Sequence, residues 1–284
     1  MSHTVMLLAD PQIGMTAAFS AMPSDIRKRV EGLFRSSGML PPEGCLRVPN
    51  KPVGFDVDLA RVRRAVDAAV RLRPDAIVIC GDLVNNIDQP EQASRLLREF
   101  ERFPTESQLI CLPGNHDLSE TFHHPNADGL AEYRRHFGVD YQRFLVGETF
   151  CLAINSETLG DPEALPAESE RQWQFIEDAL ASQEAITAAR RAVFMHTPMR
   201  TGNRVLDNGS AVLPPPISDR LLKIFAAGGV SAVFAGHLHQ NRQTVIDGIR
   251  FVVTGAIGMP VVGRSGFRLL RFDDQLTQHY VAVD

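Results

Sequence analysis

The sequence predicts an α/β fold, and two features of the chain support this class. Short apolar runs that read as buried strands alternate with segments that have the periodicity of amphipathic helices. At 284 residues, with 44% hydrophobic and 22% charged residues, the chain can bury a substantial core and has an ordinary globular composition. We find no internal repeat and no linker rich in Gly or Ser. We therefore expect residues 1–284 to form one domain.

The expected strands share one pattern, a short apolar run followed at once by polar residues or by glycine. Because a strand buried on both faces needs no alternation with polar residues, these runs read as strands of a covered sheet. They span residues 5–9, 76–80, 109–112, 150–154, 192–195 and 232–235.

Helices are expected between these strands, and the clearest carries an apolar stripe spaced three and four residues apart. Asp58 is its expected N-cap, and Pro74 lies beyond its end. The stripe consists of Leu59, Val62, Val66, Ala69 and Val70. The other expected helices span residues 90–103, 127–136, 170–182 and 218–227.

The C-terminal third changes character, because apolar runs at residues 251–254, 267–272 and 278–283 follow one another with little helix between them. This order predicts antiparallel strands that finish a second sheet. Two stretches have turn-like composition, since residues 38–54 hold four prolines and three glycines and residues 198–216 include three consecutive prolines. Either stretch is a candidate lid.

The net charge and the cysteines limit the possible cellular location and binding partners. A net charge of −5 gives no general attraction to nucleic acid or to an anionic membrane. The N-terminus lacks the pattern of a secretory signal, and no apolar run approaches the roughly 20 residues of a membrane span. Cys80, Cys111 and Cys151 lie in apolar runs and Cys45 in a loop-like stretch, without CxxC spacing. We expect a cytoplasmic protein with reduced cysteines; its oligomeric state is not indicated.

Chemistry-bearing residues follow five of the expected strands. Because ligands bind outside the carboxyl ends of the strands in an α/β sheet, these residues are expected to converge. The segments are Asp10-Pro11-Gln12, Gly81-Asp82, Gly114-Asn115-His116-Asp117, His196 and Gly236-His237-Leu238-His239. Each has an alternative explanation, such as a turn at Asp-Pro, a capped turn at Asn115–Asp117 or a structural role for a lone His196. Their joint occurrence favours function.

The ligand set contains oxygen and nitrogen donors without thiolate, which suits Mn, Fe or Zn. Seven ligands exceed the needs of one tetrahedral ion. A pair of ions that share a bridging carboxylate would use all seven, and such pairs hydrolyse phosphate esters.

In this order the motifs resemble the calcineurin-like metallophosphoesterase superfamily, whose pattern is Asp-x-His, Gly-Asp, Gly-Asn-His-Asp or Glu, a single His, and Gly-His-x-His. The resemblance implies a four-layer α/β/β/α sandwich with two facing mixed β-sheets. It places Asp10, Asp82 and His239 on a first metal ion, and Asp82 as a bridge to a second ion. It implies that Asn115, His196 and His237 hold the second ion, so that the cofactors are two divalent or mixed-valence ions.

The resemblance also assigns the proton donor and exposes one departure. His116 is implied to protonate the leaving group, and Asp117 either steers its ring or caps a turn. Gln12 stands where the family has His, and an amide oxygen is a weaker ligand than imidazole. A branch described as Ser/Thr protein phosphatases shares Ala-Asp-Pro-Gln, and the likeness to it extends along most of the chain. Its further matches are Asn155-Ser156, Gln172-Trp173 and residues 255–258.

The expected activity is hydrolysis of a phosphorylated substrate by water that two ions activate for in-line attack on phosphorus. The branch favours a phosphomonoesterase acting on phosphoserine or phosphothreonine. The alternatives are a phosphodiesterase, including one for cyclic nucleotides, and a binding scaffold in which Gln12 marks lost catalysis. Arg27, Arg200 and Arg204 are candidates to hold a second phosphate or a peptide carboxylate, although solvated surface arginines are the simpler explanation.

Overall fold

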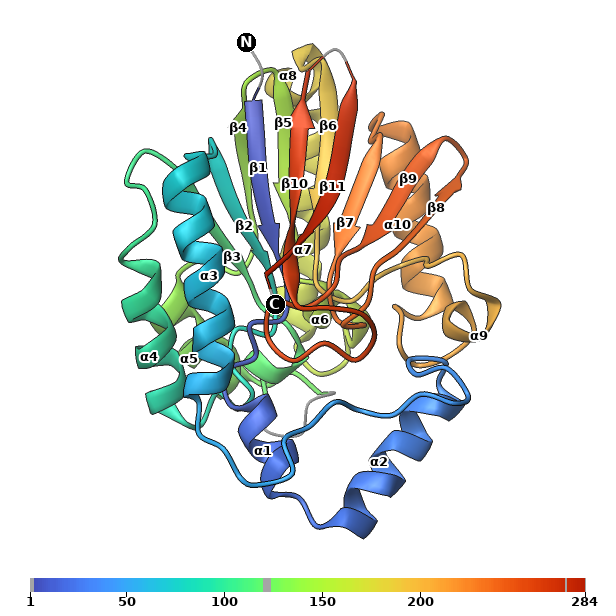
Figure 1. The fold of residues 1–284 in the computed structure, drawn as a ribbon. Helices are drawn as coiled ribbons and strands as arrows, with labels where there is room; N and C mark the ends of the chain where they lie inside the picture. Colours follow the sequence, from blue (N-terminus) through green and yellow to red (C-terminus); the bar gives the residue numbers. More distant parts are fainter. Residues whose placement is uncertain (1–2, 120–123, 274, 284) are drawn as a thin grey trace.

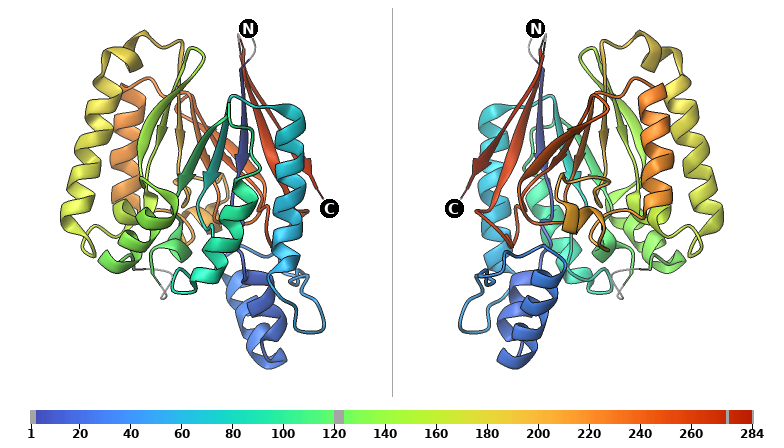
Figure 2. Two further views of the ribbon diagram at one scale, coloured as in Figure 1. Left: turned by 90° about the vertical axis from the view of Figure 1, so that its left-hand side faces the viewer. Right: turned by 90° about the vertical axis from the view of Figure 1, so that its right-hand side faces the viewer.

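The computed structural model describes residues 3–119, 124–273 and 275–283. Two β-sheets face each other, and helices cover the outer face of each sheet (Figures 1 and 2). The predicted four-layer α/β/β/α sandwich is therefore confirmed.

The first sheet has five strands in the order β11-β10-β1-β2-β3. β1, β2 and β3 are parallel, whereas β10 is antiparallel to β1 and β11 is antiparallel to β10. The strands are β1 (His3–Leu8), β2 (Ala76–Cys80), β3 (Gln108–Leu112), β10 (Gly266–Phe272) and β11 (Leu276–Ala282).

The second sheet has six strands in the order β4-β5-β6-β7-β9-β8. β5, β6, β7 and β9 run parallel, and the two edge strands are antiparallel to their neighbours. The strands are β4 (Gln142–Val146), β5 (Thr149–Ala153), β6 (Arg190–Phe194), β7 (Ala232–Ala235), β8 (Arg242–Ile246) and β9 (Ile249–Val253).

Long helices form the outer layers, where their apolar stripes pack on the sheets. The first sheet is covered by α3 (Asp56–Leu72), α4 (Pro90–Phe100) and α5 (Ala127–Phe137). The second sheet is covered by α7 (Pro166–Ala181) and α10 (Pro215–Ala227). The remaining helical elements are α1 (Met15–Ala21), α2 (Ser24–Ser36), the 3₁₀ turn η1 (Asn115–Asp117), α6 (Ser156–Gly160), α8 (Gln183–Thr187) and α9 (Arg204–Asp207).

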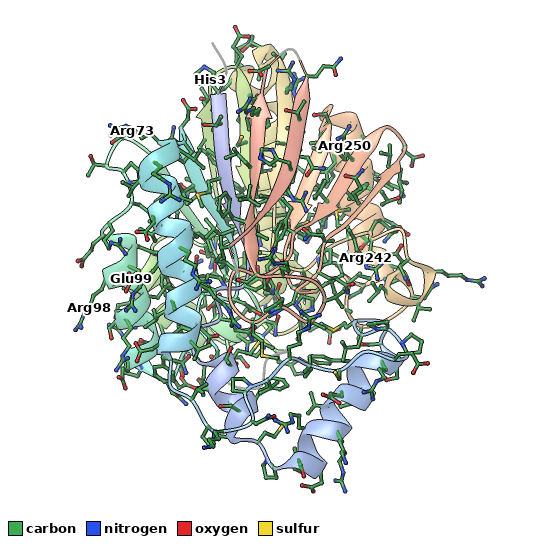
Figure 3. The ribbon with its side chains drawn as sticks, viewed as in Figure 1. His3, Arg73, Arg98, Glu99, Arg242 and Arg250 are labelled. Atoms are coloured by element: carbon green, nitrogen blue, oxygen red, sulfur yellow. The ribbon has the colours of Figure 1, made fainter. Side chains whose placement is uncertain are left out.

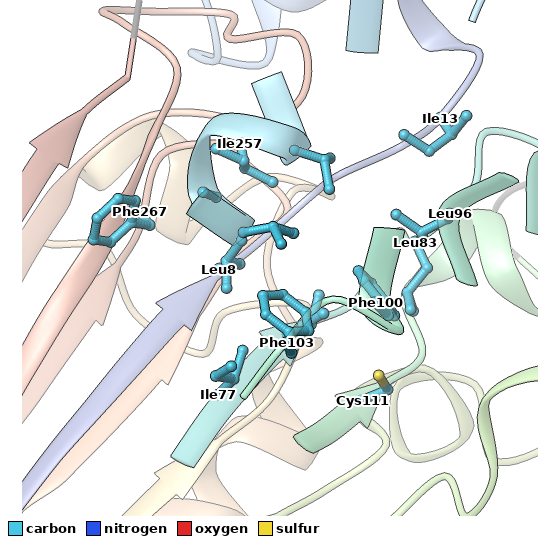
Figure 4. Close-up of a cluster of buried hydrophobic side chains, with 14 of the residues drawn as sticks. Leu8, Ile13, Ile77, Leu83, Leu96, Phe100, Phe103, Cys111, Ile257 and Phe267 are labelled. Carbon is cyan, nitrogen blue, oxygen red and sulfur yellow. The ribbon is translucent and has the colours of Figure 1, made fainter. Parts of the chain in front are cut away.

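Three apolar layers hold this arrangement together. One lies between the first sheet and its helices, where Leu8, Ile77 and Phe267 meet Leu96 and Phe100 (Figure 4). A second lies between the other sheet and α7 and α10. The third fills the space between the sheets, and it includes Val78 from β2, Phe194 from β6 and Phe234 from β7. Burial of this much apolar surface is the main stabilising contribution to the fold.

The predicted strands and long helices are all present, with bounds that differ by a few residues. β4 and β8 were missed because exposed positions alternate with buried or half-buried ones in these strands and give no apolar run. The helices α1, α2, α6, α8 and α9 were also missed, because α2 buries no residue and the others span only four to seven residues.

Two predictions about the fold are wrong. β10 and β11 are antiparallel strands as expected, but they join the first sheet beside β1 instead of finishing the second. Only the run at residues 251–254 belongs to the second sheet, as part of β9. Asp58 is not the N-cap of α3, because the helix begins at Asp56. Its buried carboxylate instead accepts hydrogen bonds from the N–H groups of Gly14 and Thr16.

The cysteines lie where the sequence predicts. Cys80, Cys111 and Cys151 are buried thiols, Cys45 is exposed, and all four are free. Among the described residues, no helix combines the length and the apolar character needed to cross a bilayer. Charged side chains such as those of Arg73, Arg98 and Arg250 lie on the outside of the sandwich (Figure 3).

Candidate metal centre

The predicted ligands converge at one end of the sandwich. Each follows the carboxyl end of a strand: Asp10 and Gln12 after β1, Asp82 after β2, Asn115 after β3 at the start of η1, His196 after β6, and His237 and His239 after β7. Two groups of donor atoms lie within 4.8 Å of one another, namely Asp82 with His196 and His237, and Asp10 with Asp82 and His239. Both sheets therefore contribute donors, and Asp82 belongs to both groups.

The backbone at these positions is strained. Among the described residues, seven residues other than glycine have a positive φ, and five of them are predicted ligands. The five are Asp10 (52°), Gln12 (38°), Asp82 (50°), His237 (70°) and His239 (50°). A left-handed conformation costs a residue with a Cβ roughly 1 to 2 kcal/mol, so the surrounding structure must enforce it. Strain concentrated at one site is typical of a functional centre.

Two glycines of the motifs allow this close packing. Gly81 has φ +76°, and a Cβ atom there would lie 2.4 Å from Nδ1 of His196. A Cβ atom at Gly114 would lie 2.2 Å from Oδ1 of Asp82. The glycines before Asp82 and Asn115 are therefore required by the space that the candidate ligands occupy.

Backbone carbonyls orient two of the imidazoles. Nδ1 of His196 lies 2.8 Å from the carbonyl oxygen of Cys80, and Nδ1 of His239 lies 2.6 Å from that of Met259. An Nδ1–H that donates to a carbonyl leaves the lone pair on Nε2, which is how protein structures prepare a histidine for metal binding. Nε2 of His196 lies 3.5 Å from Asp82 Oδ1 and 3.1 Å from His237 Nδ1.

The carboxylates at the centre are desolvated without a permanent cation beside them. Asp10 and Asp82 are 0% and 2% exposed, and their ion-pair partners among the described residues are histidines, with no Lys or Arg. Burial raises the pKa of Asp10 to about 6. Burial lowers the pKa of His196, but the carboxylates of Asp82 and Asp10 outweigh it and raise that pKa to about 9. Burying two carboxylates side by side is costly unless cations compensate them.

Gln12 also fits a cation. Its side chain is 1% exposed, and its buried Oε1 atom has no hydrogen-bond partner among the described residues. An unpaired buried amide oxygen costs about 1 to 3 kcal/mol, which a ligand or an ion can offset. Together with the shared Asp82 and the oriented histidines, this donor set fits a pair of divalent ions.

His116 lies beside the centre without belonging to either donor group. Its backbone N–H donates to Oδ1 of Asp82 at 2.9 Å, and its ring Nδ1 lies 2.9 Å from the carbonyl oxygen of Asn85. Burial lowers the pKa of the His116 imidazole. Sequence analysis missed the contribution of Asn85, because a backbone carbonyl leaves no trace in the residue type.

Of the two roles expected for Asp117, its contacts are those of a residue that caps a turn and not of one that orients the His116 ring. Its carboxylate accepts hydrogen bonds from the backbone N–H groups of Leu83, Val84 and Gly114, at 2.9 to 3.1 Å. Burial raises the pKa of Asp117 to about 8, with a further contribution from the nearby Asp82. Asp117 thus fastens the loop after β2 to the loop after β3, and the carbonyl of Asn85 takes the position beside the His116 ring.

Ser156 fixes the loop of His196 in a similar way. Its Oγ accepts hydrogen bonds from the N–H groups of His196 and Thr197, at 3.1 and 2.8 Å. The preceding Asn155 is held by Gln172, whose Oε1 accepts the Asn155 N–H at 2.6 Å. The Asn155-Ser156 and Gln172-Trp173 matches in the sequence therefore mark a support of the centre.

A comparison with protein-family models shows which family the chain belongs to. The model of the family described as calcineurin-like phosphoesterase matches residues 52–241. The chain belongs to this family. It is therefore an enzyme, a metal-dependent phosphoester hydrolase, and its two donor groups suit the dinuclear metal centre typical of the family.

Individual relatives agree with the assignment. The chain is 27% identical over 238 residues to the serine/threonine-protein phosphatase CPPED1 of Bos taurus, covering 81% of this chain and 75% of the relative. A dimetal phosphatase from Danio rerio has a similar fold, with a TM-score of 0.63 at 12% identity over 98% of this chain and 95% of that one. The purple acid phosphatase PPD1 of yellow lupin gives 0.64 at 14% identity, over 99% and 51%.

Proposed function

We propose that the protein is a phosphomonoesterase that removes phosphate from phosphoserine or phosphothreonine. The observation that carries this proposal is the pair of donor groups that share Asp82, whose members are buried except for the half-buried His237. Support for the substrate class comes from the relative named as a serine/threonine-protein phosphatase. We further propose that residues 1–284 act as one domain, because both sheets contribute to one site.

In this proposal Asp10, Asp82, His239 and Gln12 hold one ion. Asn115, His196 and His237 complete the site of the other with the shared Asp82. Bound ions supply positive charge that offsets the charge of the phosphoryl oxygens and makes water a stronger acid. Manganese, iron and zinc all suit these donors.

The chain itself contributes proton transfer and orientation. His116 donates a proton to the departing alkoxide, while the carbonyl of Asn85 keeps its Nδ1 turned away from the substrate. Asp82 holds the backbone of His116 in place through the bond to its N–H. No covalent enzyme intermediate is required, because water is the nucleophile in this proposal.

The test is a substrate screen of metal-stripped protein reconstituted with manganese, iron or zinc. We expect two ions per chain by elemental analysis. We also expect p-nitrophenyl phosphate and a phosphoserine peptide to be hydrolysed faster than bis(p-nitrophenyl) phosphate. Faster hydrolysis of the diester would favour the phosphodiesterase alternative, and activity that is independent of added metal would refute the proposal.

Gln12 offers a separate test of the metal assignment. Replacing it as Gln12→His should tighten binding of one ion by roughly tenfold or more, because imidazole is the stronger ligand. Calorimetric titration of the stripped protein measures this change. An unaltered titration would show that Gln12 does not bind metal.

A further inference from the structure

The α1–α2 hairpin, residues 15–36, projects from the end of the sandwich at which the metal-centre loops lie (Figure 1). α2 differs from the other described helices because none of its residues is buried. Its fold is nevertheless tied to the centre. Met15, Leu40 and Leu46 cluster with Met259 and Val261, and the carbonyl of Met259 orients His239.

Apolar side chains are exposed on this hairpin and on the neighbouring α9. Leu33 is 66% exposed, Ile26 38% and Val205 57%. Ile26 and Leu33 are seven residues apart and therefore share one face of α2. Val205 borders the turn that ends α2, since its Cγ1 would lie 3.1 Å from a Cβ atom placed at Gly38.

Positive charge accompanies these apolar groups. Residues 15–55 contain six Lys or Arg and three Asp or Glu, a net charge of +3 within a chain of −5, so the remainder carries −8. Arg35 pairs with Glu31, but within the described ranges no carboxylate pairs with Arg27, Lys28 or Arg29. Arg29 shares the face of Ile26 and Leu33, three residues from the former.

The three arginines that the sequence suggested as binding residues, Arg27, Arg200 and Arg204, have different surroundings. Arg200 is engaged by Asp219 at 2.8 Å and is a structural ion pair. Arg27 lies on α2 and Arg204 on α9, beside Val205. The loop that follows α2 reaches the centre, because the carbonyl oxygen of Met39 accepts a hydrogen bond from Nε2 of Gln240, the residue after His239.

From these observations we propose that Ile26, Arg29 and Leu33 of α2, with Arg204 and Val205 of α9, form a docking surface for phosphoprotein substrates. It binds a substrate segment that carries acidic and apolar residues near the phosphorylated side chain. The charge decides this occupant, because a basic appendage on an acidic enzyme attracts an anionic polypeptide. The proposal rests on the proposed function and adds a determinant of substrate choice outside the metal centre.

Steady-state kinetics with matched probes test the surface. One probe is a twelve-residue phosphoserine peptide flanked by Glu and Leu; the second has these flanks replaced by Ser, and the third is p-nitrophenyl phosphate. The double variant Leu33→Ser/Arg29→Ser removes one apolar and one cationic group. The control Ile186→Ser/Arg98→Ser makes the same replacements on α8 and α4, where Ile186 is 59% exposed.

We expect the Leu33→Ser/Arg29→Ser variant to lose about tenfold in kcat/KM for the Glu/Leu peptide, through KM, because a few contacts dominate peptide recognition. Its kcat/KM for p-nitrophenyl phosphate should stay unchanged, and the control should match the wild type on all probes. Equal loss on p-nitrophenyl phosphate, or no preference of the wild type for the Glu/Leu peptide, would overturn the proposal.

Two other outcomes distinguish the docking surface from a membrane-binding surface and from a failure of the proposed function. If the wild type binds phosphatidylserine vesicles and the double variant does not, with unchanged peptide kinetics, the surface binds a membrane and the proposal is wrong. If reconstituted wild type fails to hydrolyse p-nitrophenyl phosphate, the proposed function itself fails. Hydrolysis of that ester without any effect of the peptide flanks would overturn the docking surface alone.

Discussion

The metal-centre loops and the α1–α2 hairpin lie at the same end of the molecule but are built in opposite ways. The loops are buried, adopt strained backbone conformations and are held by side chains such as Asp117 and Ser156. The hairpin leaves Leu33 exposed and buries no residue of α2. Chemistry needs fixed donor positions, whereas recognition of varied segments needs accessible surface. Substitutions in the metal-centre loops should therefore affect turnover strongly, whereas a substitution on the exposed face of α2 should have only a small effect on stability.

The largest effect is expected at the residue shared by both donor groups. Asp82→Asn should lower metal-dependent turnover of p-nitrophenyl phosphate at least about a hundredfold, since even supporting groups of metal sites are worth 10- to 100-fold. The amide oxygen can still accept the His116 N–H, so the circular dichroism spectrum should not change. Undiminished turnover would remove Asp82 from its bridging role.

His116→Ala separates chemistry from metal binding within the same region. Two ions should remain bound, while turnover falls by about 10²- to 10⁴-fold for esters with poor leaving groups. Nitrophenolate needs little protonation and should be affected least. Rates that fall equally for alkyl and aryl phosphates would contradict a proton-donor role.

A smaller effect is expected at Gln92, which supports His116 indirectly. This 2% exposed side chain accepts hydrogen bonds from the N–H groups of Asn85 and Asn86, at 2.9 and 3.0 Å. Gln92→Leu leaves the Asn86 N–H without its acceptor and frees the carbonyl beside His116, so we expect about a tenfold loss for alkyl phosphates. Gln92→Glu keeps the acceptor and serves as the control. Identical leaving-group dependence in both variants would show a purely structural role.

The smallest effect is expected in the hairpin. Leu33→Ser should change the free energy of unfolding by no more than about 0.5 kcal/mol, because an exposed side chain loses little on replacement. Urea titration followed by circular dichroism measures this. A loss of several kcal/mol would mean that Leu33 is part of a packed core, and the contrast between the regions would disappear.

The sequence predicted the interior of the fold and the convergence of the donors because both depend on residue type. Continuous apolar runs identified β2 and β7 to the residue, and polar motifs followed their carboxyl ends. β8 was not predicted because exposed and half-buried positions alternate in this edge strand. The sheet that β10 joins was not predicted because it depends on pairing with β1, which is distant in the sequence. The support from Asn85 and Met259 escaped because backbone carbonyls are the same in every residue.

The division of the centre between the two sheets has a mechanical consequence. Asp10 and Asp82 extend from one sheet, and His196 and His237 from the other, so the spacing between the sheets sets the spacing of the donors. That spacing is maintained by the apolar layer between the sheets, in which Val78 of the first sheet packs with Phe194 and Phe234 of the second. The packing between the sheets therefore controls the distances between the donors. A cavity created deep in that layer would change how the site binds phosphate.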